Sequence, residues 1–104
     1  MTTDAVPARG EACLRVNGCA LTVRPSFGAL AAAEAELGPL FALVERAADG
    51  GLSVAELVAL FWHCLRERPD GLTREDFAEA VVEAGLAAAT PVLKGLLGQI
   101  LRGR

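Results

Sequence analysis

Aromatic residues and long apolar runs are scarce in this sequence. It contains no tyrosine, and only 5% of its 104 residues are aromatic, although 53% are hydrophobic. No apolar run reaches the ~18 residues of a transmembrane helix. The first ten residues, MTTDAVPARG, lack the basic and apolar regions of a signal peptide. We therefore expect one aliphatic-rich cytoplasmic domain that does not interact with a membrane.

Basic runs and catalytic motifs are also missing. The net charge is −3, and the ten Lys and Arg residues are scattered along the chain. Nucleic-acid-binding proteins usually carry a basic stripe, so no nucleic-acid partner is expected. The sequence has no glycine-rich phosphate loop, no GxSxG motif and no paired carboxylates beside a histidine. We expect no enzyme and no cofactor.

No metal site is predicted either. The three cysteines lack metal-ligand spacing. His63 and Cys64 adjoin, but consecutive residues of a helix point about 100° apart and cannot share a ligand. A calcium loop with Gly71 at its sixth position would place arginines at its first and third positions, where acids are needed.

Residues 11–24 predict a β-hairpin. Asn17-Gly18 is the sequence typical of a type I′ turn, because both residues tolerate positive φ. This turn pairs Leu14 with Leu21 and gathers one apolar face, which must pack on helices. Cys13 and Cys19 fall on opposite faces, so reduced thiols are expected.

Capping residues and helical spacing predict helices over residues 27–37, 39–48, 54–67, 74–84 and 88–101. Residues 1–9 are expected to be disordered or loosely held, and residues 10–102 to form a single globular domain. The predicted fold class is α+β, with an N-terminal two-stranded antiparallel hairpin packed on a four- or five-helix bundle.

The helix within residues 52–68 is apolar around most of its circumference, which is typical of a buried helix. Its predicted core face carries Leu57, Leu60, Phe61, Cys64 and Leu65. Glu56, His63 and Glu67 are expected to face water. A third side carries Val54, Val58 and Trp62, and it is either core or a partner surface.

An acidic ridge follows on the next predicted helix, where Glu75, Glu79 and Glu83 recur at four-residue spacing. Such a ridge is usually a solvated helix face. The functional interpretation is a docking surface for a basic partner.

Several segments together resemble one known family. They are the Asn17-Gly18 turn, RPSFGAL at 24–30, Gly51-Leu52-Ser53, Leu72-Thr73 and EAGL at 83–86. Over about residues 9–100 the chain is similar to the small tail proteins of gene transfer agents and tailed phages, described as tail tube components or tail assembly chaperones.

The resemblance implies a non-enzymatic tail assembly chaperone, or a minor tail component, of a gene transfer agent or prophage. It would bind tape-measure or tail tube proteins, in the cytoplasm or within a phage-like particle. Spare apolar surface is expected on the Val54, Val58 and Trp62 side and on the last helix. Two alternatives are a structural tail tube subunit and a small adaptor or regulatory domain unrelated to phage.

Overall fold

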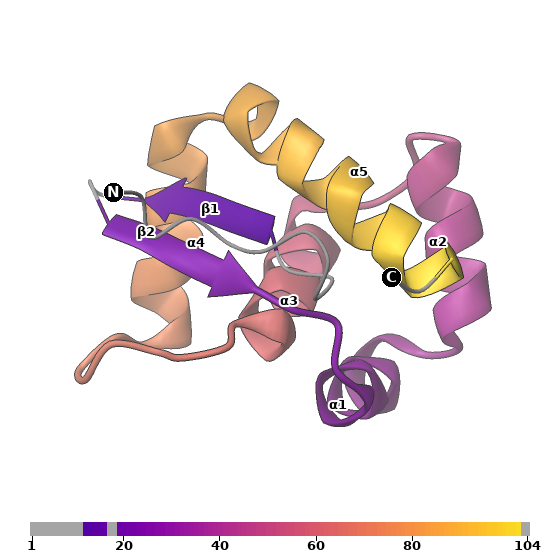
Figure 1. Ribbon diagram of the computed structural model, residues 1–104. Coiled ribbons are helices and arrows are strands. Elements are labelled where there is room, and N and C mark those ends of the chain that lie inside the picture. Colours follow the sequence, from indigo (N-terminus) through magenta and orange to yellow (C-terminus); the bar gives the residue numbers. More distant parts are fainter. Residues whose placement is uncertain (1–11, 17–18, 103–104) are drawn as a thin grey trace.

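The computed structural model describes residues 12–16 and 19–102. Figure 1 shows the elements in chain order. They are β1 (Ala12–Val16), β2 (Cys19–Val23), α1 (Phe27–Leu37), α2 (Leu40–Ala48), α3 (Val54–Cys64), α4 (Arg74–Ala84) and α5 (Leu86–Arg102). The predicted Asn17-Gly18 turn and the predicted loose segment 1–9 lie outside the described residues.

The predicted α+β class, a hairpin on a helix bundle, is wrong. Within the described residues the domain is mostly helical, and five helices build its body. The two five-residue strands pair with each other, with Leu14 opposite Leu21, and β2 gains one further bridge, from Val23 to Leu65. A two-stranded ribbon is too small to form a layer of its own. The helices are not a bundle either, because the chain bends by 81° between α1 and α2 and by 110° between α4 and α5.

Backbone contacts with β2 determine the residue at which α3 ends. The predicted helix 54–67 stops at Cys64, and Leu65 is extended (φ −62°, ψ 123°). There the Arg24 N–H donates to the Cys64 carbonyl at 2.7 Å, and the Arg66 N–H donates to the Thr22 carbonyl at 2.8 Å. Leu65 thus bridges to Val23 as a short strand partner instead of continuing the helix.

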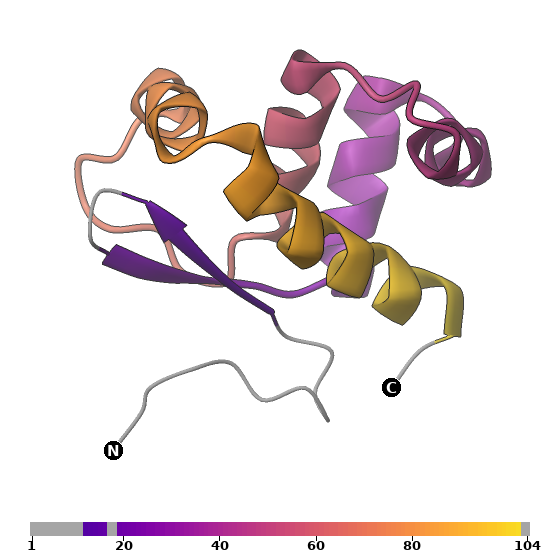
Figure 2. The ribbon, with the colours of Figure 1, turned by 90° about the horizontal axis from the view of Figure 1, so that it is seen from above.

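Helix α3 lies near the middle of the domain, between α4 and the α1–α2 pair, and α5 crosses one face (Figures 1 and 2). Its predicted core face is confirmed by burial: Leu57, Leu60, Phe61, Cys64 and Leu65. The largest other side chains with no more than 1% exposure come from four neighbouring elements: Val23, Leu43, Phe77, Val81 and Leu96. The core therefore forms around α3, as expected for a helix that is apolar on several sides.

Local caps explain where α1, α3 and α4 start. Ser26, Ser53 and Thr73 each accept a hydrogen bond from the backbone three residues later. Helix α5 starts at Leu86, two residues earlier than predicted, directly after Gly85 (φ 96°). No single described helix is long and apolar enough to cross a membrane, and the pairs α1–α2 and α4–α5 reach that length and composition only across their bends.

Candidate functional site

A shallow apolar groove runs between α3 and α4. It encloses about 430 Å³ and is lined by Val54, Ala55, Val58, Arg74, Glu75, Ala78 and Val82. Val54 and Val82 are 43% and 54% exposed, whereas Val58 is buried. The valines of α3 are four residues apart, as are Ala78 and Val82, so each helix offers one apolar edge. We call this surface the α3–α4 groove.

The acidic ridge borders this groove. Glu75 lines the groove itself, and Glu79 and Glu83 are exposed further along α4. Residues four apart lie above one another on a helix, so the ridge continues along the helix from the Glu75 edge. The structure therefore brings Val54, Val58 and the ridge together, although they are separate in the sequence.

Trp62 lies elsewhere. Its ring packs on Phe77 of α4, with ring centroids 5.8 Å apart. The Arg68 guanidinium covers the ring at 4.3 Å and donates a hydrogen bond to the Trp62 carbonyl at 3.0 Å. Trp62 is thus a half-buried residue at the edge of the core, and it does not line the α3–α4 groove.

A second apolar groove was not predicted from the sequence. It encloses about 240 Å³ between α1, α2 and the end of α5, and is lined by Leu30, Leu40, Phe41, Val44, Ile100 and Leu101. Phe41 is 81% exposed and Leu101 is 59% exposed. We call this surface the Phe41 groove. The expected spare apolar surface on the last helix is found here.

Phe41 had a signal in the sequence: a large aromatic side chain in a chain that has few. A contiguous apolar patch marks an interaction surface, and Phe41 forms one together with the exposed Leu101 of the same groove. Phe27, at the start of α1, is 89% exposed and lines neither groove.

His63 does not simply face water, as had been predicted. It is half-buried, and its Nε2 lies 2.8 Å from Oε1 of Glu36 on α1. Arg74 of α4 donates to both oxygens of the same carboxylate. These bonds, led by those from Arg74, lower the pKa of Glu36 to about 2. His63 therefore contributes to a polar connection between α1, α3 and α4.

Cys64 is a core residue. Its side chain is buried, and burial raises the pKa of its thiol to about 12. The thiolate is the nucleophilic form, so this thiol is poorly suited to covalent chemistry at neutral pH. In the described part of the chain, no three His, Cys, Asp or Glu side chains are grouped so as to hold a metal ion.

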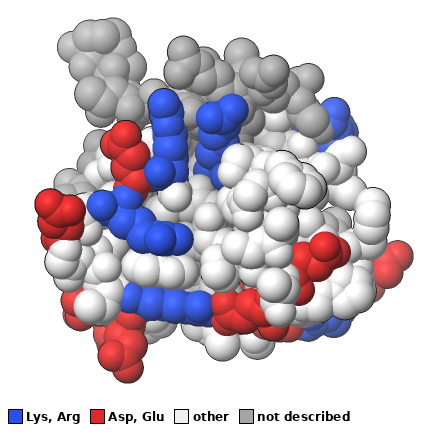
Figure 3. Space-filling model, turned by 90° about the horizontal axis from the view of Figure 1, so that it is seen from below, with Lys and Arg blue, Asp and Glu red and all other residues white. Residues whose placement is uncertain are grey.

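Charge is unevenly distributed over the lower face of the molecule. Figure 3 shows acidic and basic side chains intermixed on the left of this face, whereas the right is mostly uncharged and carries a few acidic side chains. This mostly uncharged part lies below α1 and α2 as they stand in Figure 1.

A family model described as "Phage tail tube protein, GTA-gp10" matches residues 9–103 of the chain. Neither the comparison with curated proteins nor the comparison with solved structures finds a match. The family match covers nearly the whole chain, including every described helix and both strands.

Proposed function

Because the chain belongs to the phage tail tube protein family GTA-gp10, we propose that it serves as a tail assembly chaperone or minor tail component that binds another tail protein. It performs this role without catalysis, in the cytoplasm during assembly or as part of the particle. Family membership removes the alternative of an adaptor unrelated to phage.

The observation that carries this proposal is the α3–α4 groove beside the acidic ridge. Its exposed Val54 and Val82 offer apolar contacts, and Glu75 adds a negative charge at the edge. An amphipathic helix with apolar side chains on one stripe and Lys or Arg beside it would complement both features. A tape-measure protein is a long, largely helical chain whose apolar stripes need shielding before the tube forms, so we propose it as the partner.

The second candidate is a structural tail tube subunit, which the description of the family favours. A tube built by strand pairing needs free strand edges. The outer edge of β2 is already engaged at Thr22 and Arg24 by the segment after α3. We therefore rank the binding role first. Rings or polymers of the purified protein would favour the tube subunit, whereas a small soluble species would favour the chaperone.

Co-purification with the tape-measure protein of the same tail tests the proposal. We expect a complex whose affinity falls as salt rises, because the ridge contributes charge. A Glu75→Gln, Glu79→Gln, Glu83→Gln variant should bind more weakly and lose most of this salt dependence. The matched control is Asp49→Asn, Glu67→Gln, Asp70→Asn, which removes the same charge from other exposed positions. Absence of a complex at every salt concentration would overturn the proposal.

A second pair of variants tests the apolar part of the α3–α4 groove. Val82→Gln places an amide in the groove and should weaken the complex about 10-fold. Leu86→Gln is the control, because Leu86 is 44% exposed but does not line the groove. Equal binding by both variants would show that the partner docks elsewhere.

A further inference from the structure

The Phe41 groove combines a hollow and a protrusion on one surface. Phe41 both lines the groove and projects from it, with 81% of its surface exposed. Leu101 on the opposite wall is 59% exposed. A surface that contains both a knob and a groove can be complementary to itself, as a two-fold interface requires. Large aromatic side chains at such positions are the usual anchors of an interface.

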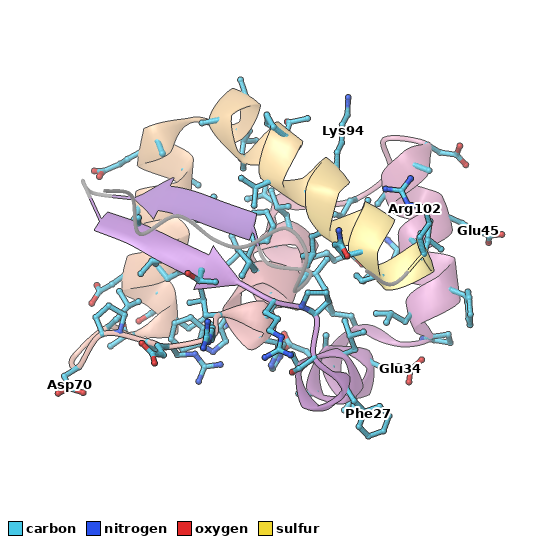
Figure 4. The ribbon with its side chains drawn as sticks, in the orientation of Figure 1. Phe27, Glu34, Glu45, Asp70, Lys94 and Arg102 are labelled. Carbon is cyan, nitrogen blue, oxygen red and sulfur yellow. The ribbon has the colours of Figure 1, made fainter. Side chains whose placement is uncertain are left out.

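The charges beside the groove have opposite signs on its two walls. Glu45 lies one turn after Phe41 on α2, and Arg102 follows Leu101 at the end of α5; both are exposed. Figure 4 shows Glu45 on the outer side of α2 and Arg102 at the end of α5. A two-fold arrangement that sets α2 of one copy against α5 of the other would place Glu45 of each copy near Arg102 of the other.

We propose that the Phe41 groove is the interface of a homodimer, with a second copy of this chain as its occupant. The Phe41 ring of each copy enters the groove of the other between α2 and α5, and the two Glu45–Arg102 pairs flank the contact. This interface lies apart from the α3–α4 groove, since the two share no lining residue. The dimer therefore leaves two α3–α4 grooves available to partners.

Sedimentation equilibrium over a range of protein concentrations tests the dimer. We expect the wild-type chain to be a dimer, and Phe41→Ser to weaken dimerisation about 30-fold or more. Phe27→Ser is the matched control, because Phe27 is even more exposed but does not line the groove. It should dimerise as the wild type does. Circular dichroism of each variant confirms that the exposed substitution leaves the helices intact.

A charge exchange tests the orientation of the two copies. Glu45→Arg alone and Arg102→Glu alone should each weaken the dimer, because like charges then face each other across the axis. The double variant, Glu45→Arg with Arg102→Glu, should recover most of the lost dimer affinity, because opposite charges face each other again. A wild-type monomer up to about 1 mM, or a dimer that survives Phe41→Ser unchanged, would overturn the proposal. A double variant weaker than both single variants would overturn the two-fold arrangement.

Discussion

Arg46 of α2 and Glu56 of α3 form an ion pair with two hydrogen bonds, in which the guanidinium donates to the two carboxylate oxygens at 2.8 and 2.7 Å. The Glu56 carboxylate also accepts the Ser53 N–H at 3.0 Å and completes a capping box. The Glu56 side chain therefore both caps the N-terminus of α3 and links α3 to α2. The Arg46 pair is the largest contribution to a Glu56 pKa of about 2, well below the usual 4.5.

Glu56→Gln separates these two roles. A glutamine can keep the capping bond to Ser53 but not the ion pair with Arg46. A lowered carboxyl pKa stabilises the fold above pH 4.5, and this contribution is lost as the pH falls from 4.5 to about 2. We expect the variant to melt at a lower temperature than the wild type at pH 7, and the two melting temperatures to converge toward pH 2.

Glu79→Gln is the control for this experiment. It removes an equal charge from an exposed position on α4, and it should change the melting temperature little at pH 7. A Glu56→Gln difference that stays constant from pH 7 to pH 2 would contradict the assigned role of the ion pair.

Trp62 is the one tryptophan of the chain, so its fluorescence reports on a single site. Arg68→Ala uncovers one face of the ring, which should shift the emission to longer wavelength and increase quenching by acrylamide. Loss of the cation–π contact should cost about 0.5–1 kcal/mol of stability. Lys94→Ala is the control, because it removes an exposed cation from α5, and it should leave the spectrum unchanged. An unchanged spectrum in Arg68→Ala would mean that the guanidinium does not cover the ring in solution.

Cys64 should be unreactive while the protein is folded. With its pKa raised to about 12 instead of 9.0, the thiolate fraction at pH 8 is about a thousandfold smaller than that of an ordinary thiol. The measurement uses a Cys13→Ser, Cys19→Ser variant, in which Cys64 is the remaining thiol. We expect slow reaction with a disulfide reagent in buffer and fast reaction in denaturant. Rapid labelling in buffer would contradict the burial of Cys64.

Gly38 sets the corner between α1 and α2. Its backbone (φ 89°, ψ −171°) lies in a region that is essentially restricted to glycine. Gly38→Ala should therefore lower the free energy of unfolding by about 1–3 kcal/mol. Gly28→Ala is the matched control inside α1, where an added Cβ meets nothing within 4 Å, and it should raise stability by up to about 1 kcal/mol. Equal effects of the two substitutions in a denaturant titration would contradict this assignment.

Local signals made the starts of the helices predictable. Ser26, Ser53 and Thr73 cap their helices through bonds that span three residues, so no distant part of the chain is needed to form them. The periodicity of residues 54–65 likewise predicted the buried face of α3, because apolar residues at helical spacing form a stripe that packs against the core. The prediction of an α+β class was wrong because a strand pattern indicates that a strand forms. It does not indicate how much of the core the strand contributes.

The candidate site was harder to predict from the sequence than the helix starts, because it depends on contacts between segments far apart in the chain. The sequence indicated Val54, Val58 and the acidic ridge, but it also grouped Trp62 with the valines. Arg68 and Phe77 cover that ring instead, and neither residue belongs to α3. Phe41 was overlooked because its exposure depends on where α5 ends relative to α2. The position of the end of α5 relative to α2 depends on how the whole chain packs, so no single segment of the sequence specifies it.

The sequence by itself determined the starts of α1, α3 and α4, the buried face of α3 and the similarity to a phage tail family. It could do so because caps and periodicity are interactions between near neighbours in the chain. Only the tertiary structure decided that α3 stops at Cys64, that Glu36 meets His63 and Arg74, and that Phe41 stays exposed. The physical reason is that each of these depends on a contact between segments far apart in sequence, whose meeting is decided when the whole core packs.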